Sequence, residues 1–282
     1  MGTSNLYKGP KSSALLPTDY NGSPDDLPEA VPSSEGPSND KQPKLEGQEE
    51  KTEQGGSKQT ETTRVKWTDA KRNFTRQIGK RSPDVRGMAR TYTKASGGYK
   101  HAAITASSSK RIARGIISLF TGSPNDIRQR LEKWEITFEG RSTNDVFNDI
   151  YPHLCTGSAS RENAVADKAL AQTFSEMFES DLFDGQGLDL FNPELLEYLV
   201  SHFVTNSIFY KLLNEVAFGE LASDKSNEDI ARIEDDLKTF IDGIVRGRVT
   251  EHLHSGIRHN EINKLVDDLY EDCYKVMEGL TE

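Results

Sequence analysis

The sequence predicts an all-α protein, in which a C-terminal bundle of about six helices follows a long disordered N-terminal region. From Ile116 onward, apolar residues recur at helical spacing, and helix-capping residues precede the apolar stretches. No segment shows the sustained alternation of apolar and polar residues that marks a half-buried strand. Seven of the eleven prolines lie between Pro10 and Pro43 among Gly, Ser, Asp and Glu, a composition that cannot bury enough apolar surface to fold.

The distribution of charge divides the chain into three segments, and we predict that each segment is a separate domain or region. Residues 1–63 carry 6 Lys and Arg against 11 Asp and Glu, and form an acidic Gly/Pro/Ser-rich tail that begins with the tag-like motif MGTS. Residues 64–114 carry 14 against 2 and are predicted to form a basic, mostly irregular arm with one short helix near 68–78. Residues 115–282 carry 15 against 32 and contain the helical bundle.

The six predicted helices of the bundle are placed by their capping residues. They begin near the following positions, in chain order: Ser123, Ser142, Arg161, Asn192, Ser226 and Asn260. The first should carry an apolar face that runs from Ile127 to Phe138 and includes Trp134. The fourth, residues 194–218, is apolar nearly all round and is therefore predicted to be the central, most buried helix.

The sequence contains no motif that indicates catalysis or metal binding: it has no P-loop, no GxGxxG and no GxSxG. His252, His254 and His259 do not have the spacing of a metal site, and nothing near Cys155 in the sequence marks it as a nucleophile. We therefore predict a non-enzymatic protein without a metal or a cofactor. Two widely separated cysteines favour a reducing, cytoplasmic location, and no apolar stretch is long enough to span a membrane.

The basic arm has two alternative uses. It has 14 Lys and Arg residues and only 2 acidic residues, and aromatic residues are interleaved among them. This composition suits phosphate neutralisation and base stacking in a nucleic acid. The same charge equally suits an acidic protein surface, either the bundle of this chain or a partner. The residues that would make these contacts are Lys66, Trp67, Lys71, Arg72, Phe74, Arg76, Lys80, Arg81, Arg86 and Arg90.

The N-terminal glycine is a further feature that needs an interpretation. Removal of Met1 would leave Gly2 with an unhindered amine, which is nucleophilic once it is deprotonated near neutral pH. Leu6 occupies the position where a myristoylation signal requires Ser or Thr, so lipidation is not indicated. The alternative interpretation is a disordered start with no role of its own.

Several segments together resemble the QatB family, a component of the bacterial Qat anti-phage defence system. They are the MGTS, GP and LLP elements of the tail, followed by SPNDIRQRL, VFNDIYPHLC, ENAVADKALAQTFSEMF and ELLEYLVSHFVTNSIFYKLLNEV. The resemblance implies a four-gene module whose other proteins are an ATPase, a QueC-like enzyme and a TatD-like metal-dependent nuclease. Tyr20 stands after the Leu-Leu-Pro element, where the resemblance leads us to expect tryptophan.

The resemblance also implies a role for the N-terminus. Gly2 would accept a deazaguanine-type group from the QueC-like enzyme, and the docking element would comprise Thr3, Ser4, Gly9, Pro10, Leu15, Leu16 and Pro17. The predicted function is therefore that of a non-enzymatic, partner-binding subunit of an anti-phage system, and a substrate for N-terminal modification. The alternative is a nucleic-acid-binding adaptor that uses residues 64–114.

Overall fold

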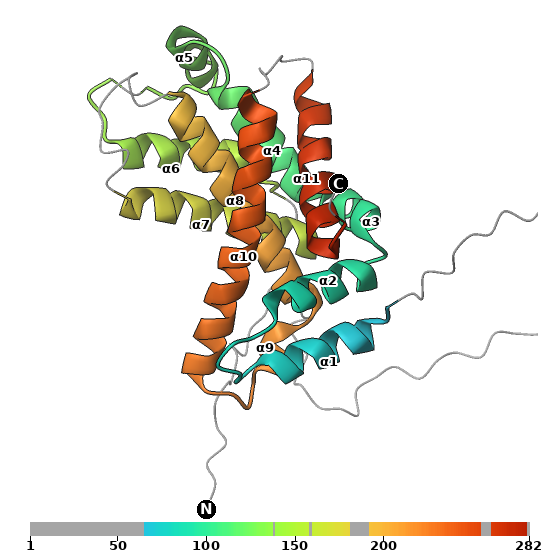
Figure 1. The fold of residues 1–282 in the computed structure, drawn as a ribbon. Helices are drawn as coiled ribbons and strands as arrows, with labels where there is room; N and C mark the ends of the chain where they lie inside the picture. The colour runs from blue at the N-terminus through green and yellow to red at the C-terminus, as the bar shows by residue number, and fades with distance from the viewer. Residues whose placement is uncertain (1–64, 138, 158–159, 181–191, 255–260, 281–282) are drawn as a thin grey trace, which may run out of the picture. The chain divides into compact units, whose positions relative to one another are not determined.

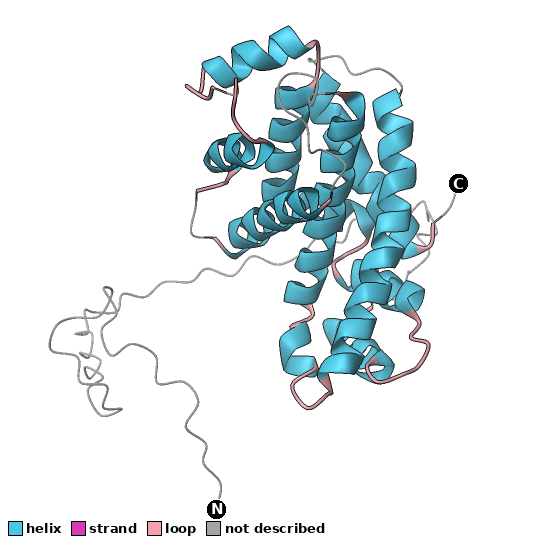
Figure 2. Ribbon diagram, turned by 90° about the vertical axis from the view of Figure 1, so that its left-hand side faces the viewer, coloured by secondary structure: helices cyan, strands magenta, loops and turns pink. Residues whose placement is uncertain are grey.

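A computed structural model of the chain describes residues 65–137, 139–157, 160–180, 192–254 and 261–280. Within these ranges it contains helices and connecting turns and no strand, which confirms the predicted all-α class (Figures 1 and 2). The disorder predicted for residues 1–63 concerns residues outside these ranges. The helices are α1 (Trp67–Gln77), α2 (Val85–Ala95), α3 (Tyr99–Ile104), α4 (Ser107–Phe120), α5 (Pro124–Glu132), α6 (Thr143–Leu154), α7 (Arg161–Glu179), α8 (Pro193–Glu215), α9 (Phe218–Leu221), α10 (Asn227–His254) and α11 (Ile262–Glu278).

Helix α8 forms the centre of the bundle, as its sequence predicts. Helices α7, α10 and α4 pack against it from different sides (Figure 1). Fourteen of its side chains are buried, among them Leu199, Phe203 and Ile208, which have no exposed surface. A helix that is apolar nearly all round can be stable only where neighbours cover every face, and this is the position that α8 occupies.

The capping residues lie where the sequence places them. The side chain of Ser123 accepts a hydrogen bond from the backbone N–H of Asp126, and Ser142 and Asn192 cap α6 and α8 in the same way. Each of these bonds satisfies a backbone donor that has no partner inside the helix, so each fixes the first turn locally. This is why the starts of the bundle helices agree closely with the prediction.

The predicted first helix of the bundle ends earlier than expected. Helix α5 stops at Glu132, and Glu135 adopts a left-handed backbone conformation with φ of 60°. The chain therefore turns before Trp134 can continue the helical face, and its indole instead stacks on His153 at 4.6 Å between ring centroids. Phe138, the last residue of the predicted face, lies outside the described ranges.

The prediction that residues 64–114 are mostly irregular is wrong. Helices α1, α2 and α3 and the first half of α4 lie in this segment, and the predicted boundary between residues 114 and 115 falls inside α4. Phe74, Met88 and Tyr92 are fully buried and belong to the same hydrophobic core as the bundle. Their charged neighbours lie on exposed faces of the same helices, so the change in charge along the chain does not coincide with a change in packing.

Several hydrogen bonds connect this segment to the rest of the bundle, and Tyr92 and Tyr99 make two of them. The Tyr92 hydroxyl donates to Oε2 of Glu215 at the end of α8, over 2.9 Å. The backbone N–H of Tyr99 donates to Oε2 of Glu278 at the end of α11, over 2.8 Å. The basic segment is therefore an integral part of the folded domain.

Candidate functional site

Helices α1 and α2 pack side by side and form a helical hairpin with a strong excess of positive charge (Figure 1). We call residues 66–94 the basic hairpin; it contains nine Lys and Arg residues and two Asp. Asp84 is engaged in capping α2, where its carboxylate accepts from the N–H of Gly87 over 2.9 Å. Asp69 lies 3.7 Å from Arg72 in an exposed pair. The other eight cations have no carboxylate of the described residues within ion-pair distance.

Most of the predicted contact residues are accessible on this hairpin. Lys66, Trp67, Arg72, Arg76, Lys80, Arg81, Arg86 and Arg90 are exposed, and Lys71 is half-buried. Phe74 is a correction to the prediction, because its side chain is fully buried and packs edge-on against Phe218, with 6.5 Å between the ring centroids. It is a core residue and cannot stack on a base without unfolding the hairpin.

The basic hairpin forms one wall of the largest surface cavity described here, which we call the hairpin cavity. It has a volume of about 920 Å³, and α3, the end of α8 and the end of α11 form its other walls. Arg90 and Lys94 line it together with Trp67 and Leu280. Trp67 and Leu280 are 37% and 44% exposed, and they are two of the three exposed large apolar side chains among the described residues. The cavity thus combines positive charge with accessible apolar surface.

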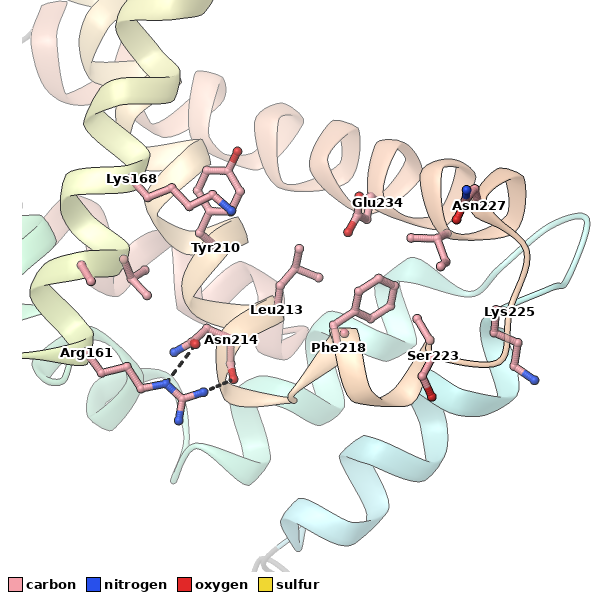
Figure 3. A pocket seen from close by; sticks show the side chains of 15 residues that line it. Arg161, Lys168, Tyr210, Leu213, Asn214, Phe218, Ser223, Lys225, Asn227 and Glu234 are labelled. Carbon is pink, nitrogen blue, oxygen red and sulfur yellow. Dashed lines mark hydrogen bonds between the residues drawn. The ribbon is translucent and has the colours of Figure 1, made fainter. Parts of the chain in front are cut away.

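A second cavity, which we call the α9 cavity, lies between α7, the end of α8, α9 and the start of α10 (Figure 3). Its volume is about 580 Å³. Arg161 donates through Nε to Oδ1 of Asn214 over 3.0 Å and through Nη2 to its backbone oxygen over 3.1 Å. The ammonium of Lys168 lies 4.2 Å from the centre of the Tyr210 ring. Glu234 lies on the opposite side of the cavity, where it is half-buried (Figure 3). Burial raises the pKa of its carboxyl group.

A third, smaller cavity of about 300 Å³ lies next to both of the others, and we call it the linking cavity. It shares Thr105 and Glu215 with the hairpin cavity and shares Arg161 and Asn214 with the α9 cavity. The three cavities are therefore neighbours along one surface that follows the C-terminal end of α8. None of the lining residues of the α9 cavity was predicted as a site residue, because they come from four helices and the turns between them and follow no local pattern.

A polar cluster joins α7, α8 and α10 away from these cavities. The Glu176 carboxylate lies 2.9 Å from Nδ1 of His202, and it accepts hydrogen bonds from Lys238, Gln172 and Asn206. Burial opposes the charge of Glu176, but the hydrogen bonds from His202, Lys238 and Gln172 outweigh this effect and lower its pKa to about 2. Because all these groups converge on one carboxylate, the cluster stabilises the interface of three helices.

Cys155 and His252, two of the residues considered as catalytic or metal-binding candidates, contact structural partners, whereas His259 and the side chain of His254 lie outside the part of the chain that the structure describes. Burial raises the pKa of the Cys155 thiol, so it stays protonated at neutral pH, where a protonated thiol is a poor nucleophile. His252 lies 3.0 Å from the carboxylate of Asp272. Among the described residues, no three His, Cys, Asp or Glu side chains are grouped so as to hold a metal ion. No helix in these ranges has the length and apolar character needed to cross a membrane.

The fold and these surfaces define an all-α bundle that presents a basic hairpin and adjoining cavities. The family model that matches the chain is that of the Qat anti-phage system associated protein QatB, over residues 97–277. This match covers more than half of the chain, and the chain therefore belongs to the QatB family, as the sequence resemblance predicts. Membership implies a role in the Qat anti-phage system, with other Qat proteins as partners. Comparisons with curated proteins and with solved structures give no match.

The matched range leaves out two of the predicted sites. The basic hairpin, residues 66–94, lies before the first matched residue. The N-terminal acceptor and its docking element also lie before it, and they are outside the residues that the structure describes; these are Gly2, Thr3, Ser4, Gly9, Pro10, Leu15, Leu16 and Pro17. Both sites therefore remain predictions.

Proposed function

We propose that this chain is a non-enzymatic, partner-binding subunit of the Qat system and that its Gly2 amine accepts a deazaguanine-type group from the QueC-like enzyme. The observation that carries the proposal is the family membership, which places the chain in the Qat system. The tag-like start supports it further, because a glycine amine is unhindered and has a pKa of about 7.7–8.0, so much of it is neutral and nucleophilic near physiological pH. The bundle would hold the partners, and the tail would present the amine.

Co-production with the QueC-like enzyme should add the mass of the transferred group to the N-terminal peptide. The Gly2→Pro variant should remain unmodified, because its secondary amine is hindered by the ring. Asn21→Ala, which lies beyond the predicted docking element, should be modified like the parent chain. Mass spectrometry of the N-terminal peptide shows whether the group has been added in the parent chain and in each of the two variants. An unmodified Gly2 in cells whose defence is active would overturn the proposal.

A second candidate function is nucleic-acid binding by the basic hairpin. It is favoured by one observation, the eight cations of this hairpin that have no carboxylate of the described residues within ion-pair distance. A Lys80→Glu/Arg81→Glu double variant at the exposed hairpin turn should weaken binding of duplex DNA. It should also reduce the slope of log K against log salt by about 2, since each phosphate contact contributes about 0.9. Fluorescence anisotropy over a salt series measures both quantities.

The matched control for this variant is Lys264→Glu, which changes the same type of charge on α11. If the double variant and the control bind DNA with the same salt slope, the hairpin is not a nucleic-acid interface. Deleting residues 2–20 separates the two functions. A nucleic-acid-binding adaptor should keep binding and defence without them, whereas a subunit that acts through Gly2 should lose defence.

A further inference from the structure

The three cavities along the end of α8 differ from the rest of this acidic chain in the balance of their charges. Seven Lys, Arg and His residues line them, against four carboxylates. Because neighbouring cavities share lining residues, the charges follow one another along the same surface, which we call the basic track. Its two ends are the hairpin cavity and the α9 cavity.

The carboxylates of the basic track are mostly engaged by the protein itself. Glu278 accepts from the N–H of Tyr99, and Glu215 accepts from the Tyr92 hydroxyl and from Lys211. Glu162 accepts from the N–H of Ser108 over 2.8 Å, in the first turn of α4. These bonds fix the positions of three carboxylates, and Lys211 also balances the negative charge of Glu215. Burial raises the pKa of the fourth, Glu234, and the nearby positive charge of Lys168 opposes this rise.

Several cations of the track, by contrast, form no ion pair with the described residues. Arg90 and Lys94 in the hairpin cavity and Lys168 in the α9 cavity have no carboxylate of the described residues within ion-pair distance. Arg161 bonds only to neutral oxygens of Asn214, so its positive charge is not cancelled. The track therefore has a surplus of positive charge along its length, and it suits an extended anionic chain.

An extended anionic chain could be a single-stranded nucleic acid or an acidic peptide. The apolar surface at both ends of the track favours the peptide. Trp67 and Leu280 provide it in the hairpin cavity, and Leu213, Phe218 and Ile230 contribute to the lining of the α9 cavity. Bases of a single-stranded nucleic acid need free aromatic faces for stacking. Trp67 is exposed at one end of the track, but Lys168 covers the Tyr210 ring at the other, so exposed aromatic rings do not follow one another along the track. Aliphatic and aromatic side chains of a peptide need only apolar contact.

We infer that the basic track is a docking surface for an extended acidic segment of a partner protein, with an apolar anchor residue at each end and carboxylates between them. The carboxylates pair with Arg90 and Lys94 at one end and with Arg161 and Lys168 at the other. The anchors enter the apolar parts of the two larger cavities. This surface is separate from the predicted Gly2 acceptor, and the inference does not depend on modification of the N-terminus.

The test uses the full chain and a short fluorescein-labelled peptide in which pairs of glutamates alternate with leucines. Arg90→Glu and Lys168→Glu should each weaken its binding by about five- to tenfold, and the effects should add, because the two residues lie at opposite ends of the track. Lys264→Glu, which lines none of the three cavities, should bind like the parent chain. Fluorescence anisotropy measures the affinities, and circular dichroism confirms that each variant is folded.

Three results would overturn the inference. One is the absence of peptide binding at physiological ionic strength. Another is an equal loss of affinity in the track variants and in Lys264→Glu, which would show a general charge effect. The third is that Arg90→Glu and Lys168→Glu impair binding of oligo(dT) of matched length while peptide binding is unchanged; the occupant would then be a single-stranded nucleic acid. The Lys80→Glu/Arg81→Glu variant should leave peptide binding unchanged, because neither residue lines the track.

Discussion

Replacing Phe74 by alanine should lower the free energy of unfolding by about 3–5 kcal/mol, the cost typical of deleting a buried aromatic ring. Phe74 is fully buried and lies edge-on to Phe218, so the truncation leaves a cavity where α1 meets α9. Rigid helices on both sides prevent the cavity from collapsing completely. Urea or thermal unfolding followed by circular dichroism measures the change.

The control for this prediction lies on the same helix. Arg76→Ala removes an exposed charge of α1 and should change the stability by less than about 0.5 kcal/mol. If Phe74→Ala costs as little as Arg76→Ala, then α1 does not contribute to the core, and the segment behaves as the irregular arm that its composition suggests. A large difference between the two variants would show that residues before the family match are needed for a stable fold.

Local capping signals made most of the bundle predictable from sequence. Ser123, Ser142 and Asn192 each stand three residues before the backbone N–H that they bind. Such a bond is made within one turn, so its residue types and spacing are visible without any knowledge of tertiary structure. The all-round apolar character of α8 was equally visible, and it correctly placed this helix at the centre.

The helices of the basic segment gave a weaker signal, for two physical reasons. Their buried faces contain many small residues, such as Ala89, Ala102 and Ala113, which pack closely but add little to an apolar pattern. In addition, α3 follows Gly98, whose φ of 88° allows a sharp entry but provides no capping side chain. The exposed Lys and Arg residues then dominated the composition, although they are compatible with a folded amphipathic helix.

Only part of the basic track could be predicted from the sequence: Trp67 and Arg90 are among the predicted contact residues, whereas Arg161 and Lys168 are not. Arg90 and Lys168 belong to helices α2 and α7, and only the packing of both around the end of α8 brings them to one surface. The engagement of Glu162 by the first turn of α4 is also a tertiary contact, between residues 54 positions apart. Charges counted along the chain do not show that three of the four carboxylates in the track accept hydrogen bonds from structural donors.

Replacing Glu176 by glutamine should destabilise the protein by about 2–3 kcal/mol at neutral pH, because it removes the charge on which several buried and half-buried donors converge. His202, Asn206 and Lys238 would each lose a charge-assisted hydrogen bond, and the Lys238 ammonium would lose its partner. Glu179→Gln is the matched control: it makes the same substitution on an exposed position of α7 and should change the stability by less than about 0.5 kcal/mol.

The effect of Glu176→Gln should depend on pH in a defined direction. The folded-state pKa of Glu176 is about 2, below the ordinary value of 4.5 that applies in the unfolded chain. Stability from this carboxylate is therefore fully present above about pH 5 and is lost as the pH falls toward about 2, where the folded protein also takes up the proton. The difference in unfolding free energy between the parent chain and the variant should shrink over this interval. A difference that is constant from about pH 5 to about pH 3 would show that the ionised carboxylate is not what holds α7, α8 and α10 together, and that the packing around it carries the interface instead.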